Sequence, residues 1–390
     1  MIIKTKVTAA GLHAAVLISA FQACKLPFAH SQGIVSTWPL YLTNSTLDPN
    51  ATRSATNFAQ YYGIASFGSP AQNFTLQIDT ATNWLWVPSS QCPTEACITH
   101  RQYNANQSST AVQFVDYEVE ALYASSTDFA DGYLVQDTFS VGSPPVIIQN
   151  QGFGSMTNVS VDQITQSEDG VMGLAPMQSI FDTSNLNVTQ FDPFFSMVIE
   201  GLLDKPQFSL WLNPNITDVN AGEVVFGGVN AARHTAPLKQ LAANSSALYW
   251  QTELQGITVA GKPLKGLQAN AAFFDSGSAQ TAVPVNDFKL INEAVAALGF
   301  NLTFDSDNDV YTIPCESAVS DNLPSIGFTM NGTTYSIPPS AWITSLGESS
   351  ENDTEYGSIC ESSIVPTSYS IASLDSGHDG ASYPIILGQM

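Results

Sequence analysis

Short apolar stretches recur along most of the chain, with polar positions alternating inside them and Gly, Ser or Pro between them. Residues 61–68 and 72–78 flank a Ser-Pro-Ala turn, which predicts a β-hairpin. Similar patterns predict further strands at 111–114, 132–135, 137–141 and 222–228. This spacing of short strands favours an all-β fold over alternating βαβ units.

Two segments instead repeat apolar residues every three or four positions and are predicted to be helices. The first covers 194–203, and the second covers 287–298 with Asn286 as its predicted N-cap. At 390 residues the chain exceeds one typical domain, so we expect two lobes. We place the N-terminal lobe at 57–232 and the C-terminal lobe at 233–390.

One pattern of residues occurs once in each predicted lobe. Each copy has an apolar run, an Asp, a hydroxyl residue, a small residue and a second hydroxyl residue, and later a Val-Pro pair. The two copies are Asp79-Thr80-Ala81-Thr82 and Asp275-Ser276-Gly277-Ser278. A weaker echo links 171–174 with 385–388. The duplicated Asp indicates that each lobe contributes one carboxylate to a shared site.

Two facing carboxylates can perform chemistry that neither performs alone. Like charges a few ångströms apart cannot both ionise easily, so Asp79 and Asp275 would share one proton. The ionised member can take a proton from a water that attacks a peptide carbonyl, while the protonated member donates to the carbonyl oxygen. This reaction needs no metal, cofactor or covalent intermediate, and we expect none.

The hydroxyl residues after each Asp have predicted supporting roles. Thr80 and Ser276 are expected to lock the two loops together, and Thr82 and Ser278 to hydrogen-bond the outer carboxylate oxygens. Turn formation alone is the other explanation for Asp followed by Thr or Ser. Two copies with matching flanks favour the shared site.

The composition is strongly acidic, with 34 Asp and Glu against 11 Lys and Arg and a net charge of −23. Such a surface repels nucleic acid and anionic membranes, so neither is an expected partner. Protonation relieves the self-repulsion at low pH. The charge therefore favours an acidic working environment, although it also serves solubility.

The N-terminal residues are typical of a secretory signal. Lys4 and Lys6 precede the apolar residues 14–20, which predicts a signal peptide at 1–23 with cleavage between 20 and 29. This apolar stretch is too short to span a bilayer. Residues 30–56 are polar without strong periodicity, so we predict a pro-segment or linker at 24–56.

Glycosylation signals and cysteines agree with export. Sequons begin at Asn44, Asn50, Asn73, Asn106, Asn158, Asn187, Asn215, Asn244, Asn301, Asn331 and Asn352. Cys24 lies at the signal boundary, and the other four cysteines allow three pairings. Proximity within each half favours Cys92–Cys97 and Cys315–Cys360.

Several motifs together give the chain a clear family resemblance. They are residues 62–72, Trp86-Val87-Pro88-Ser89, residues 169–175, Phe226-Gly227-Gly228, Tyr249-Trp250-Gln251 and residues 311–315. With the two Asp motifs, they resemble the pepsin-like aspartic proteases. The resemblance implies a bilobal β fold with a cleft between the lobes. We expect the protein to be a monomer. The resemblance also implies Asp79 and Asp275 as the catalytic pair, the same two disulfides, a peptide or unfolded protein substrate, and inhibition by pepstatin-like compounds.

The resemblance further implies a β-hairpin flap whose Tyr hydrogen-bonds a Trp at the position of Trp86. Tyr123 is the first candidate for this flap residue, and Tyr117 is the second. The family's usual Tyr-Gly-x-Gly flap sequence is absent, and the segment after Tyr123 looks longer. We therefore expect a reshaped flap.

Three other features depart from the family. Ala81 stands where the family has a glycine, so a methyl group lies at a close backbone approach that Gly277 leaves free in the other copy. Residues 25–56 hold only two basic residues, Lys25 and Arg53. The chain stops at Met390, where the family continues, so we expect a C-terminal lobe that is incomplete at its end.

Two functional hypotheses follow. The first is a secreted or vacuolar acid endopeptidase, for which the resemblance implies a preference for apolar side chains beside the scissile bond. The second is a pepsin-like binding protein with weak or no catalysis, which Ala81 and the altered flap motivate. A separate stretch, from Asp305 to Glu316, superficially resembles a calcium-binding loop. Val310 occupies the position where such a loop requires glycine, so we predict a hairpin turn instead.

Overall fold

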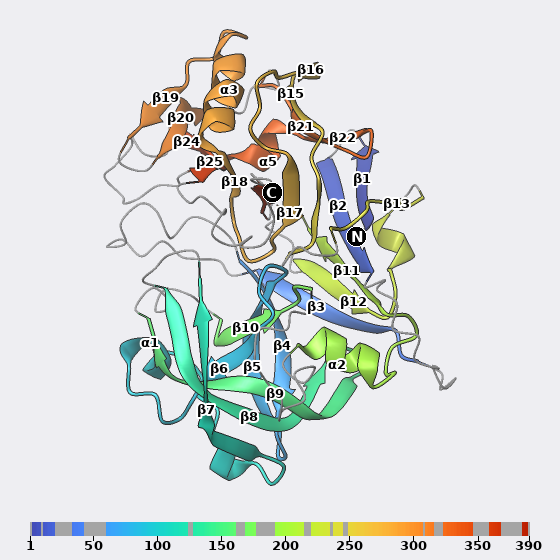
Figure 1. The fold of residues 1–390 in the computed structure, drawn as a ribbon, viewed down its shortest axis with the longest axis vertical. Coiled ribbons are helices and arrows are strands. Elements are labelled where there is room, and N and C mark those ends of the chain that lie inside the picture. The colour runs from blue at the N-terminus through green and yellow to red at the C-terminus, as the bar shows by residue number, and fades with distance from the viewer. Residues whose placement is uncertain are drawn as a thin grey trace.

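The structure is a computed structural model with two lobes built mostly from β-strands, which confirms the predicted all-β bilobal fold. It describes residues 2–8, 11–19, 33–42, 60–123, 128–160, 168–176, 192–213, 220–234, 237–244, 249–306, 309–315, 323–345, 359–367 and 384–388. For residues 2–8 and 11–19 only the backbone is described. Figure 1 shows one lobe built from the strands between residues 36 and 173 and a second built from the strands between residues 251 and 387, with the strands at 207–212 and 222–226 between them.

The strands of the first half lie between Ile2 and Phe226. They are β1 (Ile2–Thr8), β2 (Gly11–Ser19), β3 (Ser36–Leu42), β4 (Tyr61–Phe67), β5 (Gln72–Asp79), β6 (Leu85–Pro88), β7 (Val112–Leu122), β8 (Phe129–Val141), β9 (Val146–Val159), β10 (Gly170–Gly173), β11 (Gln207–Leu212) and β12 (Gly222–Phe226). With β13 (Lys239–Gln240) they form one sheet, in the order β13-β1-β2-β11-β12-β3-β4-β5-β10-β6-β9-β8-β7.

The strands of the second half form three smaller sheets, except for β13, which belongs to the large sheet. They are β13 (Lys239–Gln240), β14 (Gln251–Glu253), β15 (Gly256–Val259), β16 (Lys262–Pro263), β17 (Ala271–Phe274), β18 (Thr281–Pro284), β19 (Thr303–Asp305), β20 (Val310–Pro314), β21 (Ile326–Met330), β22 (Thr333–Ile337), β23 (Ile343–Ser345), β24 (Ile359–Ser362), β25 (Ile364–Thr367) and β26 (Pro384–Leu387). Their orders are β14-β17-β26-β18-β25, β16-β15-β21-β22 and β19-β20-β24-β23.

The α-helices in the described part of the chain are few and mostly short. They are α1 (Glu95–Ile98), α2 (Pro193–Ile199), α3 (Val285–Ala296) and α5 (Pro339–Trp342), with 3-10 turns at Ala105–Gln107 and Ala231–Arg233. α2 is shorter than the predicted 194–203, because Gly201 adopts a φ of 68° that a helix cannot continue through. α3 begins one residue before the predicted cap, so Asn286 lies inside it and donates to Gly266 O at 3.0 Å.

The two copies of the Asp motif lie in strand arrangements with the same pattern of parallel and antiparallel pairing. β5 pairs parallel with β10 and β10 pairs antiparallel with β6. In the same way, β17 pairs parallel with β26 and β26 pairs antiparallel with β18. The weak sequence echo between 171–174 and 385–388 therefore reflects equivalent strands, each lying beside an Asp strand.

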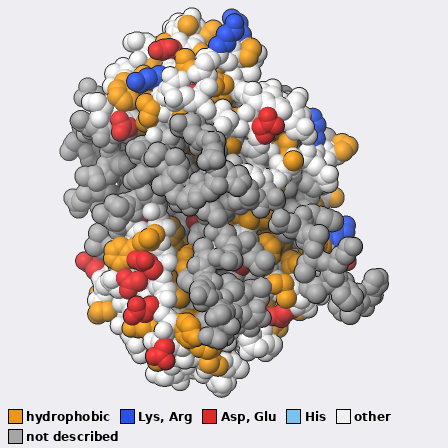
Figure 2. Space-filling view, viewed as in Figure 1, with side chains coloured by type: hydrophobic (Ala, Val, Ile, Leu, Met, Phe, Trp, Pro, Cys, Tyr) orange, Lys and Arg blue, Asp and Glu red, His pale blue; other side chains and the backbone are white. Residues whose placement is uncertain are grey.

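The edge of the large sheet is strand β7, which is exposed along most of its length. Asp116, Glu118 and Glu120 alternate along it, and charged side chains on an edge strand discourage pairing with another chain. A polar groove of about 570 Å³ lies over β7 to β9 and contains Glu118, Glu120 and Asp131, but neither Asp of the repeated motif. Figure 2 shows acidic side chains gathered over the lower lobe.

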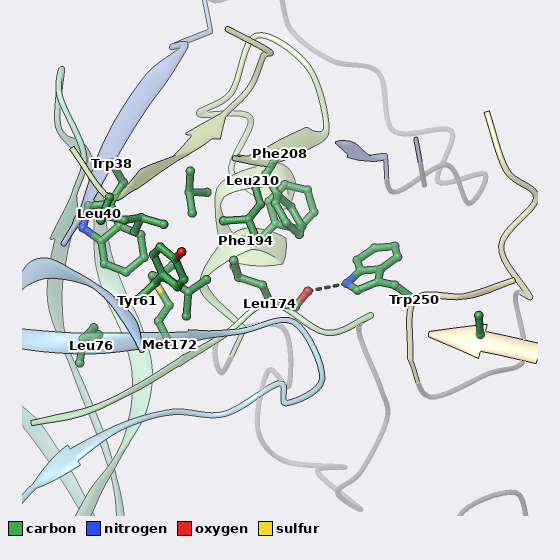
Figure 3. Packing of buried hydrophobic residues seen from close by; sticks show 14 of the residues in the cluster. Trp38, Leu40, Tyr61, Leu76, Met172, Leu174, Phe194, Phe208, Leu210 and Trp250 are labelled. Carbon is green, nitrogen blue, oxygen red and sulfur yellow. Dashed lines mark hydrogen bonds between the residues drawn. The ribbon is translucent and has the colours of Figure 1, made fainter. Parts of the chain in front are cut away.

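A hydrophobic core runs through both lobes. In Figure 3, Trp38, Tyr61 and Phe208 pack among aliphatic side chains of the first half. Trp250 comes from the second half, and its Nε1 donates to Leu174 O at 2.6 Å. This buried contact connects the end of β10 with the segment that precedes β14.

The N-terminal region differs from the expectation of an irregular segment. Ser36–Leu42 forms strand β3, and Trp38 and Leu40 are almost fully buried. Ile2–Thr8 and Gly11–Ser19 form strands β1 and β2, and β2 pairs with β11. The signal peptide at 1–23 and the processing of residues 24–56 stay predictions, since a strand can belong to a segment that is later removed.

Asp192 should make the protein less stable as the pH rises. It caps α2 by accepting from Phe195 N at 3.2 Å, and burial raises its pKa well above the usual value. A raised folded-state pKa means that stability is complete below the unfolded value of about 3.9 and is lost as the pH rises through the folded value. We expect Asp192→Asn, which keeps a capping oxygen without the charge, to raise the free energy of unfolding at neutral pH by roughly 1–3 kcal/mol.

Urea denaturation at about pH 3 and pH 7 would test this prediction. The gain should disappear at the lower pH, where Asp192 is protonated in both states. The matched control is Asp204→Asn, because Asp204 is exposed. Equal stability of Asp192→Asn and the wild type at pH 7 would contradict the prediction.

Candidate active site

The two Asp residues of the repeat occupy equivalent strand ends. Asp79 is the last residue of β5, and Asp275 directly follows β17. Asp79 Oδ1 accepts from Ala81 N at 2.7 Å and from Thr82 N at 3.1 Å. Asp275 Oδ1 accepts from Gly277 N at 2.8 Å and from Ser278 N at 3.2 Å. The same pair of backbone donors therefore orients each carboxyl.

Four hydrogen bonds interlock the two Asp loops. Thr80 Oγ1 donates to Phe274 O at 2.8 Å and accepts from Ser276 N at 2.9 Å. In the reverse direction, Ser276 Oγ donates to Ile78 O at 2.7 Å and accepts from Thr80 N at 3.1 Å. Both hydroxyl residues are buried. The structure thus places Thr80 and Ser276 where the sequence predicts, with each hydroxyl bonded to the opposite loop.

Thr82 and Ser278 contact the carboxyls differently from the prediction. Their backbone N–H groups, rather than their hydroxyls, reach the Asp oxygens. Ser278 Oγ donates to Gln280 O at 2.8 Å, and Thr82 Oγ1 accepts from Trp84 N at 3.5 Å. Each hydroxyl is therefore engaged within its own turn, which is the usual role of Ser and Thr at such positions.

The two carboxyls have unequal proton affinities. Burial raises the pKa of Asp79, and its backbone donors lower it in part. Burial also raises the pKa of Asp275, and the charge of Asp79 raises it further, to well above the usual value. A hydrogen bond between the carboxyls lowers the pKa of Asp79 and raises that of Asp275. The two carboxyls titrate as a pair, and these directions favour the shared proton on Asp275 and the negative charge on Asp79.

Gly277 makes a close approach to the opposite carboxyl. A Cβ at Gly277 would lie 2.6 Å from Asp79 Cγ, which no real Cβ can do. Ala81 occupies the matching position in the first copy and carries a methyl group. The hydrogen bond from Ala81 N to Asp79 Oδ1 is nevertheless as short as the one from Gly277 N to Asp275 Oδ1. The methyl group therefore does not disturb the amide contacts to Asp79.

Tyr123 follows β7 and lies beside Trp86. Trp86 Nε1 donates to Tyr123 Oη at 2.5 Å. Burial raises the pKa of Tyr123, and the charge of Asp79 contributes, so the phenol lies near the Asp pair. Tyr117, the second candidate, is 40% exposed and packs edge-on against Phe114. The turn residues 124–127 of the predicted flap lie outside the described residues.

Two further residues lie near the Asp pair but are not part of the repeated motif. The Tyr249 ring stacks on Phe273, with centroids 4.6 Å apart. Burial and then the charges of Asp275 and Asp79 raise the pKa of Tyr249. Gln77 is the other residue, and its Nε2 donates to Gly277 O at 3.4 Å. Strand alternation gave a signal for Gln77, because residues 77 and 79 share a face of β5.

Both predicted disulfides are present in the structure. Cys92 pairs with Cys97, and Cys315 pairs with Cys360. The suspected calcium loop connects β19 and β20, which pair as the predicted hairpin. Among the described residues, no group of three or more His, Cys, Asp or Glu side chains is arranged to hold a metal ion. Within the same ranges, no helix combines the length and hydropathy needed to cross a bilayer.

Comparison with known proteins gives consistent matches. The family model described as eukaryotic aspartyl protease matches residues 60–374. Pepsin II-1 from Oryctolagus cuniculus is 32% identical over 311 residues, which cover 78% of this chain and 73% of that protein. Gastricsin from Homo sapiens is 32% identical, with coverage of 74% and 69%. Vacuolar protease A from Aspergillus fumigatus is 30% identical, with coverage of 72% and 66%.

Proposed function

Since this chain belongs to the eukaryotic aspartyl protease family, we propose that it is an acid endopeptidase in which Asp79 and Asp275 activate a water. One observation carries the proposal. Two equivalent Asp loops are interlocked through Thr80 and Ser276, and burial raises the pKa of both carboxyls, with that of Asp275 raised further by the Asp79 charge. An ionised base beside a protonated acid is the pair that water attack on a peptide carbonyl requires.

The assigned protonation states give each carboxyl a role. Ionised Asp79 would accept a proton from the water as its oxygen attacks the carbonyl carbon. Protonated Asp275 would donate to the carbonyl oxygen, and a proton would then reach the leaving nitrogen. Because Asp275 must keep its proton, activity should fall as the pH rises through its raised pKa. The reaction should therefore be fastest at acidic pH.

We propose export to the cell exterior or to a vacuole. The predicted signal at 1–23 and the net charge of −23 support this location. Six sequon asparagines lie in described parts of the chain, and all six are exposed: Asn73, Asn106, Asn158, Asn244, Asn301 and Asn331. Expression in a eukaryotic secretory host, followed by glycosidase treatment and N-terminal sequencing, would test the signal and the glycans together.

The direct test of the function is hydrolysis of an unfolded protein at about pH 4, with and without pepstatin, by the full-length chain. Cleavage that pepstatin blocks would support the endopeptidase. Pepstatin binding without cleavage would favour the second function, a peptide-binding homologue, which Ala81 and the departure from the usual flap sequence motivate. Neither binding nor cleavage would contradict both.

Tyr123 should contribute to turnover through its bond with Trp86. We expect Tyr123→Phe to lower kcat/KM about tenfold, because it removes the acceptor of the Trp86 N–H and leaves that donor without a partner. Tyr117→Phe is the control, since Tyr117 is 40% exposed and Trp86 Nε1 donates to Tyr123 instead. An equal loss in both variants would argue against a specific role for Tyr123.

A further inference from the structure

Gln77 makes a contact between the lobes that lies outside the repeated motif. It stands two residues before Asp79 on β5, and strand alternation therefore puts both side chains on the same face. Gln77 is half-buried, and its Nε2 donates to Gly277 O at 3.4 Å. The distance is at the long end for a hydrogen bond, so the contact is weak by itself. Its importance comes from the group that accepts it.

The accepting carbonyl belongs to the peptide unit that joins Gly277 to Ser278. The N–H of the same peptide unit donates to Asp275 Oδ1 at 3.2 Å. One planar group thus accepts from Gln77 on one side and donates to Asp275 on the other. Hydrogen bonds in such a chain polarise one another, so a donor on the carbonyl strengthens the N–H as a donor.

The position of Gly277 must be fixed, because this residue affects both carboxyls. Glycine is the most conformationally free residue. Position 277 must nevertheless be glycine, since a Cβ there would collide with the Asp79 carboxyl. Movement of this residue would disturb Asp79 through contact and Asp275 through the backbone donors. A side chain that holds the Gly277 carbonyl restricts a loop that contacts both carboxyls.

The second copy of the motif lacks an equivalent contact. Phe273 occupies the matching position before Asp275, has no hydrogen-bond donor in its side chain, and stacks on Tyr249 instead. Only the loop of Asp275 is therefore held in this way. We propose that Gln77 is a positioning residue that acts on Asp275 through the peptide unit between Gly277 and Ser278. This inference rests on the proposed function, in which Asp275 is the catalytic acid.

The proposal predicts opposite changes in two variants. Gln77→Leu keeps the volume but removes the donor, so kcat should fall about three- to tenfold while KM changes less than about twofold. A weaker donor to Asp275 stabilises its ionised form less, so the upper limb of the pH profile should move to higher pH. Gln77→Glu can donate while protonated, so kcat should recover at about pH 3 and then fall at lower pH than in the wild type.

The experiment compares kcat and KM across pH for the full-length wild type, Gln77→Leu, Gln77→Glu and the control Gln113→Leu. Gln113 is exposed on β7, so its variant should match the wild type. A lower kcat in Gln77→Leu with the two opposite pH shifts would support the positioning role. An unchanged kcat and pH profile, or a change in KM alone, would overturn it, because a side chain that only lines the substrate site affects KM.

A measurement without turnover separates this inference from the proposed function. If the wild type cleaves nothing, the endopeptidase proposal fails, but the Asp carboxyls can still be titrated by carbon-13 NMR. Gln77→Leu should then raise the upper apparent pKa of the Asp79 and Asp275 pair relative to both the wild type and Gln113→Leu. An unshifted titration would overturn the role of Gln77.

Discussion

Asp79→Asn is expected to lower kcat by about 10³-fold or more, because an amide cannot accept the proton of the attacking water. The substitution keeps an oxygen for the N–H groups of Ala81 and Thr82, so the loop should retain its geometry. Removal of the Asp79 charge should also lower the pKa of Asp275 toward its ordinary range, since that charge helps to raise it. Steady-state kinetics at about pH 4 measure the first effect.

The control for this variant is Asp116→Asn, at an exposed position of β7. Both variants should unfold at the temperature of the wild type within a few degrees. Full activity in Asp79→Asn would disprove the assigned mechanism, in which Asp79 is the base and Asp275 is the acid. A loss of activity that is accompanied by unfolding would be shown by circular dichroism and would not count in favour of the mechanism.

Gly277→Ala should have the next largest effect. The added Cβ would lie 2.6 Å from Asp79 Cγ and 2.7 Å from its Oδ2, so the carboxyl or the whole loop must move. A displacement of about 1 Å in an active site can cost about 10²-fold in rate, and we expect a loss of kcat of at least that size. The measurement is kcat at the pH optimum, with pepstatin affinity as a second readout.

The chain supplies a matched control for Gly277→Ala. Ala81→Gly removes a methyl group at the equivalent position of the other copy and creates the glycine that the pepsin-like family has there. It should retain wild-type activity or exceed it. Equal losses in the two variants would mean that any change at these positions is harmful, and the close contact at Gly277 would then explain nothing.

The parts of the fold that could be predicted are those with a local or repeated signal. The Asp79 and Asp275 loops repeat one pattern of residue types, and strands β4 and β5 alternate around a clear turn. β3 was missed because Pro39 interrupts a short strand. Trp38 shows why the strand forms: its Nε1 donates to Ile64 O at 2.8 Å, and its ring stacks on Phe226. Both partners are far away in sequence.

Within the site, residue types were easier to predict than contacts. The interlocking of Thr80 and Ser276 follows from the symmetry of the motif. The sequence cannot distinguish a hydroxyl donor from a backbone donor at Thr82, because both atoms belong to one residue within reach of the carboxyl. Gln77 could be assigned to the face of Asp79, but its acceptor comes from the other lobe and becomes evident only in the folded chain.

The unequal pairs in the repeat have a consequence for the direction of the substrate. A peptide has an amino end and a carboxyl end, whereas two identical half-sites related by a twofold axis would accept either orientation equally. Gln77 against Phe273 is a difference beside the Asp pair that breaks this equivalence, with an amide on one side and a stacked ring on the other. Such differences would favour one direction of the bound polypeptide over the other. That direction determines which carboxyl faces the leaving amine.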